Sequence, residues 1–490
     1  FFLIFFLFYD LFSIRFHICR YAPFSKNSPS YQFLLSFLPY SLCAFLDKSP
    51  LSSFFLIFFL FYDLFSIRFH ISQIFCICFA LICKLNLATM KTTFVVGAGA
   101  AGFFAAIHHK SNWPDDRTII IEKSNDCLTK VKLSGGGRCN VTHACFDPRQ
   151  LCEFYPRGSK ELRGPFHEFQ PEDTMAWFES RGVKLKIEPD NRVFPVSNDS
   201  SDIANCLMDE AKALGIAVWT SCGIAAINKT DQLFVITLKN GQTHTCNKLI
   251  LATGSNRQGY QLAESLGHTI VSPVPSLFTF KISDPQLHQL SGLSVQHVQV
   301  QLSVGKKQRH NGPLLITHWG MSGPAIIKSS SWHAIELHDT NYSCTMTIDW
   351  LPELQPNQIQ QSIEKIMHSR PKQRPDKQSP FSELPGRLWA YLIQHWRISL
   401  PDHWGGLNKR QIQQMAERVK ADAFEISGKG IFKEEFVTCC GVALNEINFS
   451  NMESNICPNL HVVGELLNID GITGGFNFQS AWTTGVLSAN

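Results

Sequence analysis

A chain of 490 residues is long enough for two or three domains, since a domain usually contains roughly 100 to 200 residues. Its formal net charge of +4 is close to neutral for this length and does not call for a nucleic-acid or membrane-surface partner. The 16 cysteines are scattered and form no C-x-x-C pair, which excludes a disulfide scaffold, a zinc site and a thioredoxin-like centre. We therefore expect a reducing, cytoplasmic protein without disulfides or a bound metal.

Residues 1–89 differ in composition from the rest of the chain. The string FFLIFFLFYDLFSIRFHI at residues 1–18 recurs unchanged at residues 54–71, and the segment lacks Gly, Val, Glu, Trp and Met. Charged residues interrupt its apolar runs well short of the roughly 20 residues of a membrane-spanning helix. It also lacks the basic start and the cleavage site of a signal peptide. We expect spurious translation of upstream sequence rather than an anchor, with the native start at Met90.

After Met90 the pattern becomes that of a βαβ unit. TTFVV (92–96) predicts a strand, GAGAAG (97–102) predicts a glycine-rich turn, and the following residues have helical spacing until SNWPDDR (111–117). TIIIEK (118–123) predicts a second buried strand. Two buried strands joined through a helix indicate a parallel sheet and an α/β fold.

Later elements extend this domain to about residue 275. Residues 201–214 predict an amphipathic helix, and Asn240-Gly241 between two strand-like runs predicts a hairpin. KLILATG (248–254) predicts a buried strand with glycine at its carboxyl end, where ligands collect in open α/β sheets.

Two insertions are expected to interrupt the domain. Alternating runs between Leu277 and Asp349 predict a β-rich insertion, and residues 353–425 have a mostly helical pattern. NLHVVGE (459–465) predicts another buried strand, so the C-terminal segment should rejoin the first domain. The predicted parts are an extension at 1–89, a Rossmann-type domain at 90–275 and 431–490, a β-rich insertion at 276–350 and a helical insertion at 351–430.

The first glycine-rich turn has the composition of a dinucleotide-binding fingerprint. Gly97 permits a tight turn, Gly99 lets the backbone approach a pyrophosphate, and Gly102 lets the helix pack closely on the strand. The helix N-terminus offers amide donors to phosphate. Glu122 stands 20 residues after Gly102, where an acidic residue meets ribose hydroxyls and disfavours a 2′-phosphate. A solvated glutamate at the strand end is the alternative.

Two further glycine-rich segments are candidates for cofactor contacts. The three glycines of SGGGRCN (134–140) can turn consecutive amides toward an anion, and Arg138 can add positive charge, although a surface loop would have the same composition. No local feature lowers the pKa of Cys139, so we do not expect a catalytic thiolate there. Glu465 can accept hydrogen bonds from hydroxyls, and a helix from Phe478 can direct its positive end toward a reduced flavin. The alternative is a glycine-rich turn that caps a core helix.

Five strings resemble the BaiN-like (YhiN-type) bacterial flavoprotein family over essentially all of residues 90–490. They are GAGAAG, SGGGRCN, RVFPVS (192–197), ITHWGMSGPA (316–325) and GELLNIDGITGGFNFQSAW (464–482). The resemblance implies an NAD(P)/FAD-dependent oxidoreductase, some members carrying aminoacetone-oxidase-type names. It also implies a Rossmann-type FAD-binding domain, a parallel sheet plus β-meander, with an inserted β-barrel-like and small helical region.

By motif position, the resemblance implies FAD contacts at Gly97, Gly99, Ala100, Ala101, Gly102, Glu122, Lys123, Gly135, Gly136, Gly137, Arg138, Cys139, Asn140, Thr253, Gly254, Gly464, Glu465, Gly474, Gly475, Phe476 and Asn477. The chain departs from the family at residues 438–442, where members usually have T-x-G-G-V and Cys440 takes the first glycine position. If that position needs a positive φ, the turn is strained by about 1 kcal/mol or more. Cys439 and Cys440 are interpreted as small buried residues, with a redox couple as the alternative.

We expect hydride transfer through bound flavin to or from a small organic substrate that lies between the ring and the β-rich insertion. No second G-x-G-x-x-G is present after the first, so NAD(P)H is at most a transient donor. His318 is the candidate for proton transfer, because imidazole titrates near neutral pH, although a structural histidine is the alternative.

Two other functions remain as alternatives. GKKQRH (305–310) together with Lys372, Arg374 and Lys377 would suit an FAD-dependent tRNA-modifying protein. A flavin-binding sensor without turnover would carry the same cofactor motifs. The main interpretation expects neither a nucleic-acid partner nor a membrane for residues 90–490.

Overall fold

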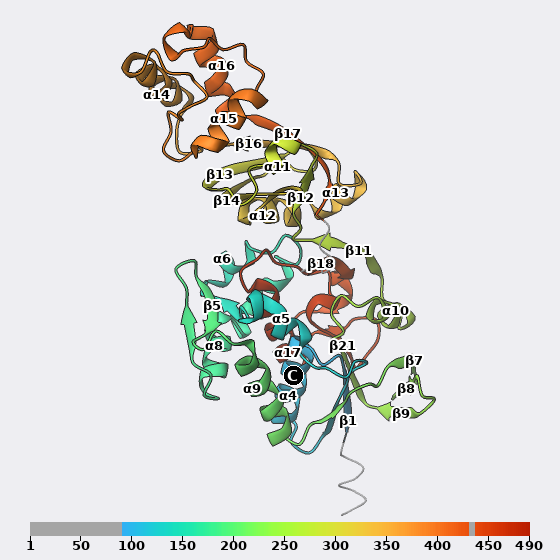
Figure 1. The fold of residues 1–490 in the computed structure, drawn as a ribbon. Coiled ribbons are helices and arrows are strands. Elements are labelled where there is room, and N and C mark those ends of the chain that lie inside the picture. Colours follow the sequence, from blue (N-terminus) through green and yellow to red (C-terminus); the bar gives the residue numbers. More distant parts are fainter. Residues whose placement is uncertain (1–90, 431–436) are drawn as a thin grey trace, which may run out of the picture. The chain divides into compact units, whose positions relative to one another are not determined.

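The central sheet is built from the buried apolar runs of the sequence. A computed structural model describes residues 91–430 and 437–490, so the prediction for residues 1–89 lies outside the described residues. Five parallel strands are neighbours in the order β21 (Leu460–Val462), β10 (Lys248–Leu251), β1 (Thr92–Val96), β2 (Arg117–Ile121) and β6 (Ala217–Trp219). Figure 1 labels β21 and β1. The short antiparallel strands β20 (Glu453–Ser454) and β19 (Ile447–Asn448) extend one edge.

Helices bury the sheet. α4 (Ala100–Asn112) packs against α9 (Ser200–Ala213) and against the C-terminal helix α17 (Phe476–Leu487). Gly485 permits the close approach of α17, since a Cβ there would lie 2.9 Å from the Ala101 carbonyl oxygen. The other helices of this domain are α5 (Thr129–Gly137), α6 (Pro148–Cys152), η1 (Glu161–Arg163), α7 (Pro165–Glu168), α8 (Pro171–Glu179), α10 (Arg257–Ser265), η3 (Leu444–Glu446) and η4 (Gly464–Leu466).

Three small sheets complete this part of the chain. The meander consists of β7 (Ile224–Lys229), β8 (Phe234–Leu238) and β9 (Thr243–Cys246), and Gly241 has φ +86° in the predicted hairpin turn. A second sheet has the order β3 (Thr142–His143), β5 (Arg192–Pro195) and β4 (Leu185–Ile187). β11 (Ile270–Ser276) and β18 (Val437–Val442) pair antiparallel where the chain leaves and re-enters the domain.

The β-rich insertion is a closed six-stranded barrel. Its order is β12 (Phe280–Ile282), β15 (Gly320–Ser322), β14 (Arg309–Thr317), β13 (Ser294–Leu302), β16 (Cys344–Asp349) and β17 (Asp422–Lys429). β17 falls within the range predicted as helical, and the sequence pattern concealed it because the inward position 422 is an aspartate. Asp422 is fully buried and accepts a 2.9 Å hydrogen bond from Trp350 Nε1. The barrel also carries α11 (Pro285–His288), α12 (Pro324–Trp332) and α13 (Ala334–Asp339).

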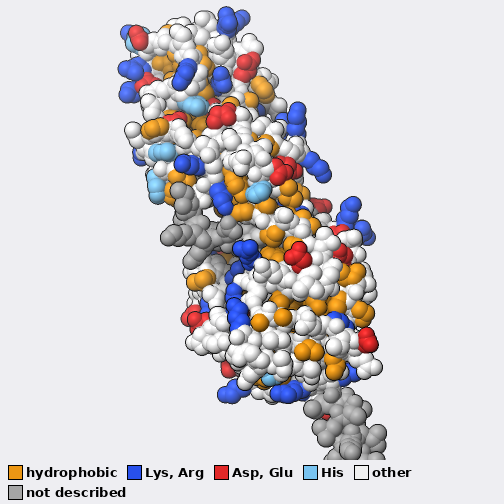
Figure 2. All heavy atoms as spheres, turned by 90° about the vertical axis from the view of Figure 1, so that its right-hand side faces the viewer, with side chains coloured by type: hydrophobic (Ala, Val, Ile, Leu, Met, Phe, Trp, Pro, Cys, Tyr) orange, Lys and Arg blue, Asp and Glu red, His pale blue; other side chains and the backbone are white. Residues whose placement is uncertain are grey.

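The helical region is a separate layer of α14 (Pro356–Ser369), α15 (Gly386–His395), η2 (Trp404–Gly406) and α16 (Lys409–Lys420), drawn in orange in Figure 1. Its core contains three buried tryptophans, Trp389, Trp396 and Trp404. Several Lys and Arg side chains stand on its surface, at the upper end of Figure 2. The predicted fold class, a Rossmann-type parallel sheet with a meander, an inserted barrel and a small helical region, is therefore confirmed.

Two further sequence expectations can be compared with the described residues. All eleven cysteines in this part of the chain are free. None of the helices in the described ranges combines the length and the apolarity needed to cross a bilayer.

Three buried histidines make the stability of this fold depend on pH. Burial lowers the pKa of His109 and His461 to about 3 and that of His310 to about 4. These imidazoles stay neutral in the folded chain at pH values where an unfolded chain, with a histidine pKa near 6.5, binds protons. Stability is therefore complete above about pH 6.5 and is lost as the pH falls toward 4, by up to roughly 1.4 kcal/mol per group and pH unit.

We expect the free energy of unfolding of residues 90–490 to be lower at pH 5.5 than at pH 7.5 in urea titrations. His461→Leu should reduce this difference, because Nδ1 of His461 is buried without a hydrogen-bond partner and its loss costs little at neutral pH. The control is the same measurement on His297→Gln, at an exposed position of β13. A pH dependence that is identical in the parent and the His461 variant would contradict the assignment.

Candidate functional site

The parallel sheet brings four predicted segments to one edge. The carboxyl ends of β1, β2, β10 and β21 are adjacent because these strands are parallel neighbours. Gly97 follows β1, Glu122 follows β2, Gly254 follows β10 and Glu465 follows β21. Residues that are up to 368 positions apart in the sequence, from 97 to 465, thus line one edge, where open α/β sheets bind ligands.

The turn between β1 and α4 contains two glycines that packing requires and one glycine that faces open space. Gly97 has φ +110°, and a Cβ there would lie 2.4 Å from the Ala252 oxygen. A Cβ on Gly102 would lie 1.9 Å from the Gly97 oxygen. Gly99 has nothing within 4 Å of its Cβ position and is the N-cap of α4, without a side-chain cap. The first amides of the helix, at Ala100 and Ala101, are thereby open to an anion.

Glu122 links the end of β2 to this turn. Its Oε2 accepts a 2.9 Å hydrogen bond from Ala98 N, and its Oε1 accepts from Ser124 N at 2.9 Å and Ser124 Oγ at 2.7 Å. An ionised carboxylate has about four acceptor positions, so it can still accept from a ribose hydroxyl. The neighbouring Lys123 is exposed.

The three-glycine segment ends α5 with a kink. Gly135, Gly136 and Gly137 have φ of +59°, +70° and +83°, a region that favours glycine. Gly136 and Gly137 have nothing within 4 Å of their Cβ positions. The charge of Arg138, however, is engaged elsewhere, since Nη1 donates to Glu188 Oε1 at 2.7 Å and the guanidinium stands 4.0 Å from the centroid of the Phe194 ring.

Cys139 and Asn140 fix the position of this segment. Cys139 is fully buried, and burial raises the pKa of its thiol to about 12, which opposes a thiolate and agrees with the sequence interpretation. The Asn140 amide fits best when its nitrogen donates to Thr142 O at 3.0 Å and its oxygen accepts from Gly475 N at 2.9 Å. Asn140 therefore joins the three-glycine segment to the C-terminal glycine turn.

The C-terminal glycine turn leads directly into α17, two residues earlier than the predicted start. Gly475 has φ +93°, and a Cβ there would lie 2.5 Å from the Thr142 backbone. The ring of Phe476 stacks on those of His143, at 4.6 Å, and Phe154, at 4.4 Å, and these two rings are 5.6 Å from each other. Asn477 makes two 2.8 Å hydrogen bonds to the backbone of Gly471. The side chains of Phe476 and Asn477 thus hold the turn in place.

The sequence analysis missed a lysine at this edge. Lys130 Nζ donates to Glu465 Oε2 at 2.5 Å and to Ser255 Oγ at 3.0 Å. Glu465 Oε1 accepts from Thr438 N at 3.2 Å, and a Cβ on Gly254 would lie 3.6 Å from Glu465 Oε2. The only signal in the sequence is the position of Lys130 four residues before Ser134 of the SGGGRCN string.

The sequence analysis also missed an ion pair between the partly buried Arg157 and the fully buried Asp470. Arg157 donates through Nε and Nη2 to the two carboxylate oxygens of Asp470, and Nη2 also donates to Ser331 O of α12 at 2.9 Å. Ser276 Oγ of β11 donates to Asp470 Oδ2 at 3.2 Å. The pair therefore connects the glycine-turn segment, the strand that leaves the domain and the barrel.

The structure also defines the conformation of Cys440 and the position of His318. Cys440 has φ +73°, so the first glycine position of the family string does require a positive φ, at a cost of roughly 1–2 kcal/mol for a residue with a Cβ. His318 lies exposed in the turn between β14 and β15, with its ring 4.4 Å from that of Trp319. Within residues 91–430 and 437–490, no hydrogen bond, ion pair or ring contact connects His318 with the glycine segments, and its proton-transfer role stays a prediction.

His143 is a histidine that the sequence analysis did not select. It is half-buried and stacked on Phe476, and a Cβ on Gly474 would lie 3.4 Å from its Cδ2. Burial lowers the pKa of His143, so this imidazole is neutral near pH 7.

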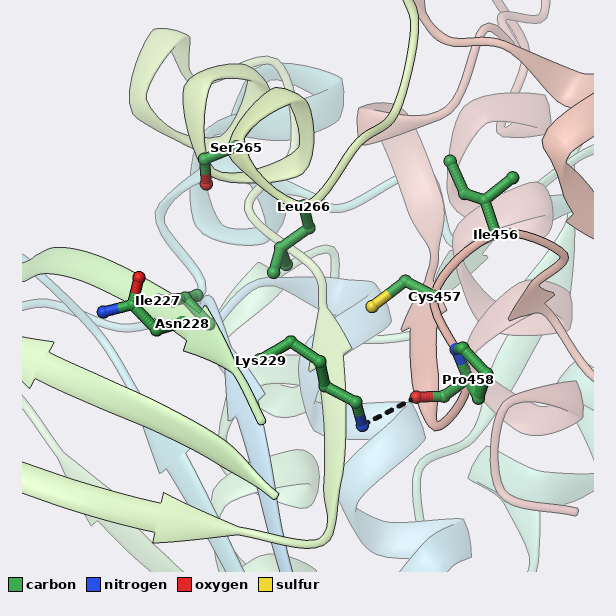
Figure 3. Close-up of a pocket in the computed structure, with 8 residues that line it drawn as sticks. All are labelled: Ile227, Asn228, Lys229, Ser265, Leu266, Ile456, Cys457 and Pro458. Atoms are coloured by element: carbon green, nitrogen blue, oxygen red, sulfur yellow. Dashed lines mark hydrogen bonds between the residues drawn. The ribbon is translucent and has the colours of Figure 1, made fainter. Parts of the chain in front are cut away.

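A pocket of about 340 Å³ lies apart from the predicted cofactor contacts (Figure 3). It is formed by the end of β7, the end of α10 and the loop that precedes β21, and Lys229 Nζ donates to Pro458 O at 3.0 Å beside it. This loop is at the amino end of β21, whereas Glu465 follows the carboxyl end. None of the predicted cofactor contacts lines this pocket.

The family comparison matches nearly the whole described chain. Residues 91–490 match the model described as HI0933-like protein Rossmann domain. The 3-dehydro-bile acid delta(4,6)-reductase of Clostridium scindens is 26% identical over 406 residues, which cover 80% of this chain and 97% of that protein. The ribosomal RNA dihydrouridine synthase of Escherichia coli is 27% identical over 406 residues, with 80% and 95% covered.

Among solved structures, a 3-ketosteroid delta1-dehydrogenase from Sterolibacterium denitrificans matches with a TM-score of 0.42 and 11% identity. The match covers 82% of this chain and 99% of that one.

The glycine geometry fits a dinucleotide and yields a test. Gly99→Val should lower the thermal midpoint of the cofactor-free protein only slightly, because the backbone of Gly99 is extended, with φ −94°, and its Cβ position is open, so that the cost is that of a poorer N-cap. A side chain there would occupy the space of a pyrophosphate, so we expect FAD affinity to fall at least about tenfold, a loss of about 1.4 kcal/mol. Fluorescence titration with FAD measures the change. Gly386→Val, at an equally open glycine of α15, is the control and should bind FAD like the parent.

The ion pair yields a second test. Asp470→Asn should lower the free energy of unfolding by about 3 kcal/mol, because it leaves the guanidinium of Arg157, whose side chain is only 13% exposed, without its counter-charge. The double variant Arg157→Met/Asp470→Leu should be less destabilised than Asp470→Asn, since no buried charge remains. Urea unfolding measures both. Equal losses in the two variants would show that shape and not charge compensation matters at this position.

Proposed function

Because the chain belongs to the HI0933-like family of FAD-dependent oxidoreductases, we propose that residues 90–490 form a reductase that saturates a carbon–carbon double bond conjugated with a carbonyl group. The two curated relatives support this class of substrate. A 4,6-unsaturated 3-oxo bile acid and the uracil ring of uridine look unrelated, yet each has a C=C bond conjugated with a C=O group. The shared electronic feature suggests that the family site recognises an electron-poor alkene.

The residues at the carboxyl edge of the sheet are proposed to hold FAD. The open amides at the start of α4 and the open Gly136 and Gly137 would face its diphosphate, and Glu122 would accept from its adenosine ribose. Glu465 would accept from the hydroxyls of its linker, which requires that the exposed Lys130 share or release this carboxylate. When bound, FAD supplies a two-electron carrier that can exchange hydride with a nicotinamide and with an organic acceptor.

The chain itself would stabilise negative charge and hold the reacting groups in position. The N-terminus of α17 begins at the Gly474–Gly475 turn, where its partial positive charge favours negative charge nearby. Asn140 and Asn477 keep this turn rigid through their hydrogen bonds. Saturating the double bond also requires a proton at the carbon next to the carbonyl. His318 is the candidate from the sequence for this proton transfer.

NAD(P)H is proposed as the transient electron donor. The sequence contains only one fingerprint of the G-x-G-x-x-G type, and that turn is assigned to FAD. The nicotinamide would therefore bind and leave from the same open edge rather than occupy a domain of its own.

A second candidate substrate is a uridine within RNA, in place of a free small molecule. It is favoured by the ribosomal RNA dihydrouridine synthase among the relatives and by the Lys and Arg residues on the helical region. This candidate departs from our sequence expectation of no nucleic-acid partner. It resembles the alternative of a tRNA-modifying protein and differs from it only in the kind of RNA.

Anaerobic reduction tests the proposed function. Protein comprising residues 90–490 should be yellow or bind added FAD, and its 450 nm absorbance should bleach with NADH or NADPH. Reoxidation should then follow addition of a 4,6-dien-3-one steroid or of uridine-containing RNA, with product identified by mass. A saturated 3-oxo steroid serves as the matched control and should leave the flavin reduced. A colourless protein that refuses FAD, or reduced flavin that neither class of alkene reoxidises, would refute the proposal.

A further inference from the structure

Positive charge is concentrated in the helical region. Residues 351–421 contain eleven Lys or Arg and six Asp or Glu, a net charge of +5. The remaining residues of 91–490 contain 27 basic and 31 acidic side chains, a net charge of −4. Residues 91–490 are therefore nearly neutral as a whole, with a net charge of +1, but consist of two parts of opposite sign.

Six of these cations lie on two segments that the fold brings together. The loop after α14 contains Arg370, Lys372, Arg374 and Lys377, and α16 begins with Lys409 and Arg410. Gly405 N donates to Pro371 O at 2.9 Å, and Trp404 N donates to Gln373 O at 2.8 Å, which fixes the loop against η2 just before α16. All six side chains are exposed. We call these six residues the basic surface.

Local carboxylates neutralise only part of the basic surface. Asp376 pairs with Arg374 at 3.0 Å and lies 3.9 Å from Lys377. In the described ranges, none of the ion pairs includes Lys372, Lys409 or Arg410. These three cations are therefore available to an external anion.

Helix stability does not explain Lys409 and Arg410. They are the first two residues of α16, where the helix dipole disfavours positive charge. The start of the helix is already specified by the capping box of Asn408 and Gln411, with hydrogen bonds of 2.9 and 3.0 Å. Two cations thus occupy positions where they weaken the helix.

The surface has the character of a phosphate-binding site more than that of a protein interface. Protein interfaces are anchored by exposed aromatic or aliphatic side chains. The large apolar side chains that are exposed in the described residues include none between 351 and 421. Contacts to a phosphate backbone need only flexible cations.

We propose that the basic surface binds the phosphate backbone of an RNA whose base is the substrate of the reductase. This inference rests on the proposed function for the chemistry at the base, but the binding itself does not require turnover. The inserted helical region would then supply affinity for the polynucleotide, while the site at the sheet edge would act on one base.

Salt-dependent binding tests the inference. The probe is a fluorescein-labelled, uridine-containing stem–loop RNA, titrated with FAD-loaded protein comprising residues 90–490 and followed by anisotropy between 50 and 200 mM KCl. The triple variant Lys372→Gln/Lys409→Gln/Arg410→Gln should bind at least about tenfold more weakly at 100 mM KCl. Its slope of log K against log salt should be smaller by roughly 2 to 3, as expected for three lost phosphate contacts.

The matched control is Lys184→Gln/Lys212→Gln/Lys239→Gln, which removes three exposed lysines from the Rossmann-type domain. It should bind RNA within about twofold of the parent, because its charges lie away from the basic surface. The thermal midpoint of the first variant should stay the same or rise, since it removes cations from the start of α16. A fall in its midpoint together with weaker binding would instead indicate a folding defect and overturn the inference.

Further outcomes separate the two proposals. Equal weakening in both triple variants, or no RNA binding by the parent, overturns the basic surface. Tighter binding of poly-glutamate than of RNA would assign the surface to an acidic protein and also overturn it. Reduction of the dienone steroid should be the same in the parent and both triple variants. Loss of all reduction with surface-dependent RNA binding intact would refute the proposed function and leave the surface standing.

Discussion

Parallel pairing of four strands is the constraint on which the site depends. A parallel sheet places the carboxyl ends of β21, β10, β1 and β2 along one edge, whatever the length of the connections between them. The connection after β10 contains the barrel and the helical region, yet β21 still returns to pair beside β10. The insertions could therefore be added without moving the glycine turns apart.

The glycines of this edge serve two different physical purposes. Gly97, Gly102 and Gly475 are required by packing, because a Cβ at each would overlap neighbouring backbone. Gly99, Gly136 and Gly137 have open space in front of them, which packing alone would not require. Asn140 and the Arg157–Asp470 pair then join the turns to one another and to the barrel. The site is a rigid backbone cradle, and its side chains mainly hold that backbone in position.

In the two proposals, the sheet edge and the inserted helical region have different functions. The edge offers amide donors, carboxylate acceptors and a helix N-terminus, which suit a dinucleotide and a developing negative charge. The helical region contributes charge rather than reactive groups, since its cations are exposed and its tryptophans are buried. Substrate choice within an otherwise common chemistry would thus depend on the insertions.

The sequence by itself determined the elements whose signals are local. Apolar runs gave the strands of the parallel sheet, and Asn240-Gly241 gave the hairpin. For Cys440 the sequence stated a positive φ only as a condition, and the structure meets that condition with φ +73°. Only the tertiary structure decided what depends on distant partners. It engaged Arg138 with Glu188, brought Lys130 to Glu465, paired Arg157 with Asp470 and turned part of the predicted helical region into the barrel strand β17. The partner of a charged side chain, or of an aspartate that faces inward, leaves no periodic pattern in the sequence. The fold determines that partner, and neighbours along the chain do not.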